Sequence, residues 1–177
     1  MPSSKREGSI RPHFFRGVAT IVTKLFNATS PNVVFFGQKD IQQCVVIRTM
    51  IKDLLMPIRM VIVPTMREPD GLAMSSRNRY LSPSERASAP ILYQGLLSGQ
   101  KMVQSGIYSR KEIIDQASSL IQKDPSVQLE YLSIADPTNL HEIDSVAQGA
   151  IFSGAIRVGK TRIIDNLLLG LTVDDLK

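Results

Sequence analysis

The first third of the chain carries the hydrophobic patterns of a strand–helix–strand unit. Residues 33–36 and 58–63 are short apolar runs, a pattern typical of strands buried on both faces of a parallel sheet. Residues 40–54 lie between them and favour a helix that ends before Pro57. An earlier helix is predicted over residues 17–26, where apolar side chains recur every three or four positions. A helical crossover makes the two strands parallel neighbours, so this segment predicts part of a Rossmann-like sheet.

The pattern changes beyond residue 71. Ser82 is a typical N-cap and opens a predicted helix over residues 83–104, which we expect to be kinked at Pro90. A further helix is expected over residues 109–123. Three later runs alternate or stay apolar, and they predict the strands of a small antiparallel sheet: residues 127–134, 150–158 and 162–169.

These elements predict an α/β fold with two domains. The first is an incomplete doubly wound, Rossmann-like parallel sheet, and the second is a small α+β domain with antiparallel strands. We expect the boundary within residues 71–82, which gives domains over residues 1–75 and 76–177.

Positive charge is concentrated in the front of the chain, whose net charge is +5 overall. Residues 1–79 hold 12 Lys/Arg and 5 Asp/Glu, a balance of +7, whereas residues 80–177 hold 9 and 11, a balance of −2. Such a field attracts an anion, either a nucleic acid or a small phosphorylated molecule. The basic residues come singly rather than in blocks, which favours the small molecule, and about half of them are ordinary surface charges.

The composition of the chain limits where in the cell the protein is expected. The chain has no apolar run near the ~18 residues that a membrane span needs, and no apolar stretch follows its basic start, so we expect neither a membrane protein nor a secreted one. A cleaved organelle presequence stays open. The single cysteine, Cys44, lies in an apolar run and is interpreted as a core residue rather than a nucleophile. We therefore expect a cytoplasmic protein.

The first candidate site lies where the strand 33–36 gives way to a helix. Ligands of open α/β sheets bind at the carboxyl ends of the strands, and a helix N-terminus offers free N–H groups to an anion. Gly37 allows close approach of the backbone, and Lys39 supplies a full positive charge suited to a phosphate. Asp40 could accept from ribose hydroxyls, and Gln43 shares its helix face. A capped, solvated helix start would explain the same residues.

A second candidate is the polar loop Met74-Ser75-Ser76-Arg77. Two hydroxyls and a guanidinium suit the oxygens of a triphosphate, and Arg77 could stabilise charge on a leaving pyrophosphate. A generic polar linker would also contain these residue types, so the loop carries weight only together with the first motif.

Together the two motifs resemble the pantothenate synthetase family, the pantoate–β-alanine ligases of the nucleotidyltransferase superfamily. The resemblance rests on three runs and continues more loosely to about Asn166: residues 11–20, 35–43 and 64–81. It implies that residues 1–75 are the second half of a nucleotide-binding domain and residues 76–177 a C-terminal lid domain. The chain would then be the C-terminal part of such a ligase.

The resemblance implies a ligase that joins pantoate to β-alanine through pantoyl adenylate, with release of pyrophosphate and AMP. Mg²⁺ would arrive with ATP, and a homodimer is common in the family. No nucleic-acid or membrane partner is expected. Lys39, Ser75, Ser76 and Arg77 would carry the catalysis. The ATP site would comprise Gly37, Gln38, Lys39, Asp40, Met66, Met74, Ser75, Ser76 and Arg77, and the pantoate site Gln43 and Arg11.

The chain also departs from the family. The front half of the family's sequence, with two histidines that steady the phosphates, is missing, and neither His13 nor His141 occupies that motif. We interpret His13 as a loop residue and His141 as an inert turn residue. Two apolar strands alone leave an edge and a hydrophobic face exposed. We therefore expect a part of a larger chain, or one that needs a second polypeptide, with weak ATP binding at most and no turnover alone.

Two rival interpretations remain open. Residues 154–161 match the P-loop pattern G-x4-G-K-[ST], but their interior favours a strand and Gly159-Lys160-Thr161 a hairpin turn, which disfavours a P-loop NTPase. The other rival is non-enzymatic: a remnant that pairs with a complete subunit or, less favoured, a basic nucleic-acid-binding module.

Overall fold

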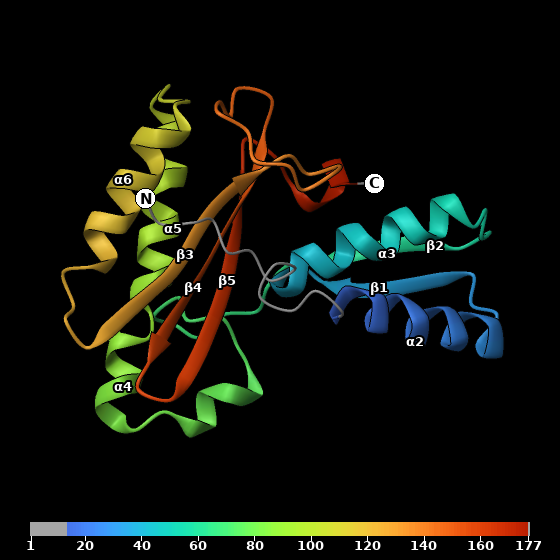
Figure 1. The fold of residues 1–177 in the computed structure, drawn as a ribbon, viewed down its shortest axis with the longest axis horizontal. Coiled ribbons are helices and arrows are strands. Elements are labelled where there is room, and N and C mark those ends of the chain that lie inside the picture. The colour runs from blue at the N-terminus through green and yellow to red at the C-terminus, as the bar shows by residue number, and fades with distance from the viewer. Residues whose placement is uncertain (1–13, 177) are drawn as a thin grey trace.

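The computed structural model describes residues 14–176, which form two lobes (Figure 1). The N-terminal lobe runs from α2 (Phe14–Thr29) through β1 (Val33–Gly37), the 3₁₀ turn η1 (Gln38–Asp40) and α3 (Ile41–Asp53) to β2 (Arg59–Val63). β1 and β2 pair in parallel, in register from Val33 opposite Arg59 to Gly37 opposite Val63. The predicted strand–helix–strand unit is therefore confirmed.

One face of this two-stranded sheet is covered and the other is open. Val22 and Phe26 of α2 pack with Ile47 and Ile51 of α3 over the face that carries Val34 and Phe36. Side chains alternate along a strand, so the neighbouring residue Phe35 points to the other face, where 67% of it is exposed. β1 bonds only to β2 among the described strands, and the predicted exposure of an apolar face and an edge is confirmed.

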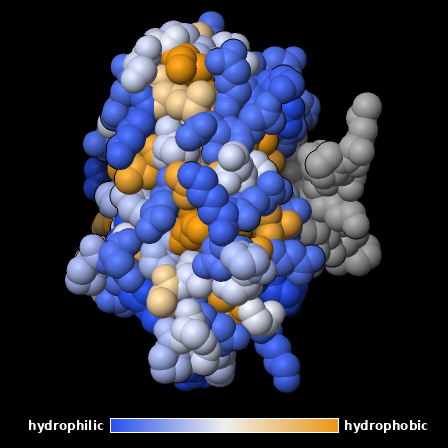
Figure 2. Space-filling model, turned by 90° about the vertical axis from the view of Figure 1, so that its left-hand side faces the viewer, coloured by the Kyte–Doolittle hydropathy of each residue, from blue (hydrophilic) through white to orange (hydrophobic). Residues whose placement is uncertain are grey.

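The C-terminal lobe packs helices on a three-stranded antiparallel sheet in the order β3-β4-β5 (Figure 1). Its elements are α4 (Pro83–Ser88), α5 (Ile91–Gln104), α6 (Arg110–Ile121), β3 (Val127–Ala135), β4 (Ala150–Val158) and β5 (Thr161–Leu169). The α/β architecture and the antiparallel sheet agree with the sequence prediction. The outer side of this lobe is mainly hydrophilic, and its hydrophobic spots are small and separate (Figure 2).

The predicted kinked helix over residues 83–104 is wrong in one respect, because it is two helices. Ser82 and Glu85 form a reciprocal capping box at the start of α4, as expected for an N-cap. The helix then ends at Ser88, and α5 begins after Pro90. Proline has no backbone N–H and its ring clashes with the preceding turn, so the chain breaks here instead of bending.

The lobes share a small core, which fixes where the candidate site lies. Ile41, Cys44 and Val45 of α3 pack against Ile151 of β4 and Leu168 of β5. Cys44 is buried, and burial raises the pKa of its thiol to about 12, in agreement with its interpretation as a core residue.

The P-loop interpretation is wrong. Gly159 and Lys160 form the turn of the β4–β5 hairpin, in which Val158 pairs with Thr161 and Gly159 has a φ of +55°. A phosphate-binding loop opens a helix, whereas this segment continues directly into a strand. None of the helices within residues 14–176 is long and apolar enough to cross a lipid bilayer.

Candidate nucleotide site

A hollow lies where the two lobes meet, at the carboxyl end of β1. From the N-terminal lobe it is lined by Lys39, Asp40 and Gln43, and Arg77 approaches it from the loop before α4. The three-stranded sheet contributes the opposite wall, with side chains from all three strands: Tyr131, Ser153, Arg162, Ile164, Asp165 and Asn166. A smaller adjoining hollow is lined by Lys39, Ser75, Arg77 and Asn78 among others. The two cations that sequence analysis assigned to phosphates therefore share one cavity.

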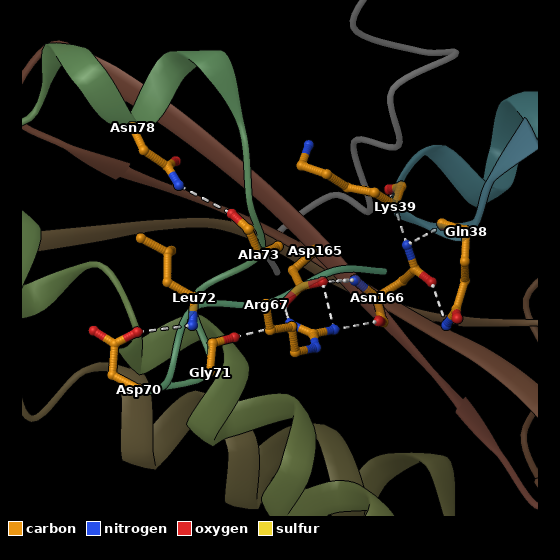
Figure 3. Close-up of polar contacts among 10 residues, drawn as sticks. All are labelled: Gln38, Lys39, Arg67, Asp70, Gly71, Leu72, Ala73, Asn78, Asp165 and Asn166. Carbon is orange, nitrogen blue, oxygen red and sulfur yellow. Dashed lines mark hydrogen bonds and ion pairs between the residues drawn. The ribbon is translucent and has the colours of Figure 1, made fainter. Parts of the chain in front are cut away.

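The turn η1 sets the positions of the N-terminal side chains. β1 ends at Gly37, and Gln38–Asp40 form one 3₁₀ turn before α3 begins. Asp40 and Gln43 are three residues apart and Lys39 and Gln43 four, so all three lie on the same side of the helix start. Asn166 of the sheet bonds to the backbone oxygen of Lys39, and the Lys39 side chain points away from Asn166 (Figure 3).

The side chain of Gln38, a predicted ATP-binding residue, lies outside the hollow. Its side chain is buried and donates from Nε2 to Oδ1 of Asn166 at 3.3 Å. Asn166 in turn donates from Nδ2 to the backbone oxygens of Gln38, at 2.9 Å, and Lys39, at 3.0 Å. Gln38 thus contacts the other lobe, and it is absent from the lining of both hollows.

The loop that leads to Arg77 is braced from within. Arg67 bridges to Ala73, and the Glu68 N–H donates to the Leu72 oxygen at 2.9 Å. Gly71 has a φ of +91° and lies against the Tyr93 ring, so only glycine fits there without a shift of that ring. This hairpin-like segment delivers the residues that follow it to the rim of the hollow.

The remaining predicted residues take several places. Ser75 caps the 3₁₀ turn η2 (Ser76–Tyr80) by accepting from the Arg77 N–H at 3.3 Å, and it lines the smaller hollow. Ser76 is exposed beside it. Met66 and Met74 are exposed and line neither hollow, and Gly37 is exposed at the end of β1. Arg11 and His13 lie outside the described residues, and His141 is exposed in a loop.

Sequence analysis missed a buried ion pair beside the hollow. Arg67 binds Asp165 through two hydrogen bonds, of 2.6 and 3.0 Å, and Asp165 is 4% exposed. Burial raises the pKa of Asp165, and the bidentate guanidinium opposes that rise. The available signal was local: Asp165 and Asn166 interrupt a strand that is otherwise β-branched or leucine-rich. Buried polar residues in such a place need partners, and here those partners come from both site segments.

The described residues offer no ready-made metal centre. No three His, Cys, Asp or Glu side chains within residues 14–176 gather to hold an ion. The lining of the hollow includes cations, amides and the carboxylates Asp40 and Asp165, and its cations Lys39 and Arg77 suit an anionic ligand.

Comparison with known proteins connects this geometry to a family. Residues 2–168 match the family model of pantoate-beta-alanine ligase. The pantothenate synthetases of Herpetosiphon aurantiacus and Chloroflexus aggregans are 50% and 48% identical to this chain over 164 residues each, which is 92% of this chain and 59% of each relative.

Solved structures give the same answer. The crystal structure of pantothenate synthetase from Thermus thermophilus matches with a TM-score of 0.87 at 42% identity, over 92% of this chain and 58% of that one. The pantoate-beta-alanine ligase of Francisella tularensis, whose structure is complexed with beta-gamma ATP and beta-alanine, matches with a TM-score of 0.67 at 28% identity, over 95% of this chain and 55% of that one. The chain thus spans under three fifths of the length of these proteins, and it belongs to the pantoate-beta-alanine ligase family.

Proposed function

We propose that this chain forms the ATP- and pantoate-binding part of a ligase that condenses pantoate with β-alanine to pantothenate. The observation that carries the proposal is the shared hollow, in which Lys39 and Arg77 approach one space from two separate segments. Family membership supports it, as does the ligand pair named for the Francisella structure. A biosynthetic ligase of this kind would work in the cytoplasm.

In the first step, a carboxylate oxygen of pantoate attacks the α-phosphorus of ATP, and the bond to the β-phosphate oxygen breaks. The products are pantoyl adenylate and pyrophosphate, and no protein nucleophile is needed. Catalysis then consists of alignment and charge neutralisation. Lys39 and Arg77 would neutralise the phosphates, the hydroxyls of Ser75 and Ser76 would donate to them, and Gln43 would hold pantoate together with Arg11.

The rest of the ATP would lie along the carboxyl end of β1. Gly37 permits close approach there, and Asp40 would accept from the ribose hydroxyls. The backbone of Gln38 would contribute to the same edge, while Met66 and Met74 would cover the nucleotide. Mg²⁺ prefers phosphate oxygens and water, so it would arrive on ATP without a cage of protein ligands.

In the second step, the neutral amine of β-alanine attacks the acyl carbon of pantoyl adenylate. The amide bond forms, the bond from the acyl carbon to the phosphate oxygen breaks, AMP leaves and one proton is released. The sheet wall of the hollow carries the polar side chains Tyr131, Ser153 and Arg162, which would face this step.

We further propose that the working enzyme contains more polypeptide than these residues. The chain spans 59% of its Herpetosiphon relative, and Phe35 exposes an apolar face that a folded enzyme would cover. Added strands on the free edge of β1 would complete the sheet, and the whole would associate as a homodimer. Alone, the chain would bind ATP weakly at most and would not turn over.

The same exposed face also favours a second candidate function. A remnant that pairs with a complete pantothenate synthetase subunit would use the free edge of β1 in the same way, without activity of its own. Co-production of the tagged chain with the complete Herpetosiphon enzyme distinguishes the two: a stable mixed complex whose rate is unchanged by Lys39→Ala in this chain would favour the remnant.

The direct test compares two lysines for ATP binding by titration calorimetry. Lys39→Ala should weaken ATP binding by about tenfold, the loss expected for one charge-assisted contact. Lys160→Ala is the matched control, because Lys160 lies in the β4–β5 turn, and it should leave the affinity unchanged. ATP–pyrophosphate exchange with pantoate, run with and without the remaining segment of the Herpetosiphon relative, then tests the chemistry. Loss of affinity only in Lys160→Ala would contradict the assignment.

A further inference from the structure

Two adjacent residues of β5 hold the two candidate phosphate-binding segments in place. Asp165 binds Arg67 of the loop that leads to Arg77, and Asn166 binds the turn that carries Lys39 (Figure 3). Asp165 is 4% exposed and Asn166 is 1% exposed, so both are almost fully enclosed by protein at the wall of the hollow.

Asn166 uses all of its polar groups. Its Nδ2 donates to the backbone oxygens of Gln38 and Lys39, and its Oδ1 accepts from the Gln38 side chain. Its own N–H donates to Asp165 Oδ1 at 2.8 Å, and its backbone oxygen accepts from Arg67 at 3.4 Å. A fully satisfied buried amide has one favourable orientation, so the turn can dock on β5 in one register only.

Arg67 performs the equivalent task for the loop. Besides Asp165, its guanidinium donates to the Gly71 oxygen at 3.0 Å, and it stacks 4.2 Å from the centroid of the Tyr93 ring on α5. The loop is thereby tied to both the sheet and a helix of the C-terminal lobe. Asp165 and Asn166 are neighbours in β5. A shift of the turn that carries Lys39 would therefore also displace the loop that leads to Arg77, and the reverse.

We propose that Asn166 is a positioning residue, which sets the place of the Lys39 ammonium relative to Arg77 by clamping the η1 backbone to β5. The Arg67–Asp165 pair braces the opposite segment. This inference rests on the proposed ATP site. The clamp acts on backbone oxygens and not on the Lys39 side chain, so it fixes where that side chain begins without a hydrogen bond to its ammonium.

The first test is a double-mutant cycle on ATP affinity, measured by calorimetry on this chain below its unfolding transition. Asn166→Asp keeps the shape but replaces the donating amide with a carboxylate facing two carbonyl oxygens. It should raise the Kd for ATP about tenfold. If Asn166 acts through Lys39, the double variant Lys39→Ala/Asn166→Asp should bind ATP no more weakly than Lys39→Ala alone. Additive losses, or an unchanged Kd in Asn166→Asp, would overturn the proposal.

A second measurement separates this proposal from the proposed function. Amide hydrogen exchange without ligand should accelerate at least tenfold over residues 38–43 in Asn166→Asp, with β4 amides unchanged. Unchanged exchange over residues 38–43 overturns the clamp whether or not ATP binds. If ATP binds the unaltered chain neither alone nor together with the remaining segment of the Herpetosiphon relative while exchange accelerates, the ATP site is wrong and the clamp itself is supported.

Two further variants keep the result interpretable. Glu142→Gln breaks an ion pair at 2.9 Å with Arg110, and neither of these two residues lines a hollow. It should lower the unfolding temperature without changing exchange over residues 38–43 or ATP affinity. If Asn166→Asp does not fold, Asn166→Ser removes the amide without burying a carboxylate, and it should give the same pattern with a smaller increase in exchange. If Asn166→Ser, like Glu142→Gln, lowers the unfolding temperature but leaves exchange over residues 38–43 and ATP affinity unchanged, the proposal is overturned.

Discussion

The apolar strands of the two lobes differ in how far they are buried. In the C-terminal lobe, β4 lies between β3 and β5, with helices on one face and the junction with the N-terminal lobe on the other, and all of its residues but Arg157 are buried. In the N-terminal lobe, β1 has helices on one face, one neighbouring strand and no buried residue, and most of Phe35 is exposed. Apolar sequence alone therefore does not produce burial, because the number of packed layers decides it.

This contrast shows that the C-terminal lobe covers its apolar surface, whereas the N-terminal lobe leaves part of its apolar surface exposed. We call them the closed lobe and the open lobe. The outer side of the C-terminal lobe is mostly hydrophilic (Figure 2), as expected for a closed unit. The N-terminal lobe instead leaves Ile21, Leu25, Leu54 and Leu55 exposed around its small sheet. The candidate site lies between the two, so its sheet wall belongs to the closed lobe and its helix start to the open one.

A pair of phenylalanines tests the contrast most strongly. Phe152 of β4 is fully buried against the helices, so Phe152→Ala should lower the free energy of unfolding by about 3–5 kcal/mol. Phe35→Ala removes the same ring from the open face and should change it by less than about 1 kcal/mol. Urea unfolding followed by far-UV circular dichroism measures both.

The reverse order of effects would contradict the contrast. A large cost for Phe35→Ala would mean that its ring is covered in solution, for example by a second copy of the chain. Sedimentation of the unaltered chain and of Phe35→Ala at several concentrations distinguishes that case from monomeric behaviour.

Two helical glycines should respond to alanine substitution with smaller changes in stability, and these changes should have opposite signs. A Cβ on Gly99 of α5 would lie 2.6 Å from the Phe152 ring and 2.7 Å from Ile113, both buried, so Gly99→Ala should destabilise the chain by about 1–3 kcal/mol. A Cβ on Gly17 of α2 meets nothing within 4 Å, so Gly17→Ala should stabilise it by about 0.5–1 kcal/mol through helix propensity.

Thermal unfolding of the two variants beside the unaltered chain measures both signs. Stabilisation by Gly99→Ala would show that the core of the C-terminal lobe has room that the structure lacks. Destabilisation by Gly17→Ala would show that the exposed side of α2 is packed against something in solution.

The sequence predicted the elements better than it predicted the contacts between them. The spacing of apolar residues, and the turn-forming residues between the runs, placed all five strands to within about one residue. This worked because each strand carries its own apolar run. The cluster of Lys39 and Arg77 was also foreseen, from their places after a strand and in a polar loop. The break at Pro90 was underestimated, since sequence does not show whether neighbours will hold a kinked helix together.

The clamp beside the hollow could not be predicted in the same way. Arg67 and Asp165 are 98 residues apart, and Gln38 and Asn166 are 128 apart. Only folding brings them together, and no local pattern specifies such a pairing. For the same reason the sequence did not show that the Gln38 side chain bonds to Asn166 at the junction of the lobes.

The smallest expected effect concerns the polar edge of the closed lobe and depends on pH. Glu130 of β3 receives hydrogen bonds from Arg157, at 2.7 Å, and from Arg162. Burial opposes its ionisation, but the two guanidiniums outweigh burial and hold the pKa of Glu130 below its ordinary value of 4.5. The folded chain therefore binds this proton less tightly than the unfolded chain, so the stabilisation is complete above pH 4.5 and is lost as the pH falls through the lowered value.

Glu130→Gln should accordingly cost about 1 kcal/mol at pH 7 and progressively less towards pH 3, because protonation removes the same charge from the unaltered chain. Urea unfolding of both proteins at pH 7, 5, 4 and 3 measures the difference, in which the other carboxylates cancel. Arg162 also lines the candidate hollow, so the variant should loosen that wall together with the strand edge. A difference that stays constant down to pH 3 would mean that Glu130 acts there through its shape and not its charge. Glu130 would then stabilise the closed lobe through packing and not through charge, which sharpens the contrast of that lobe with the open one.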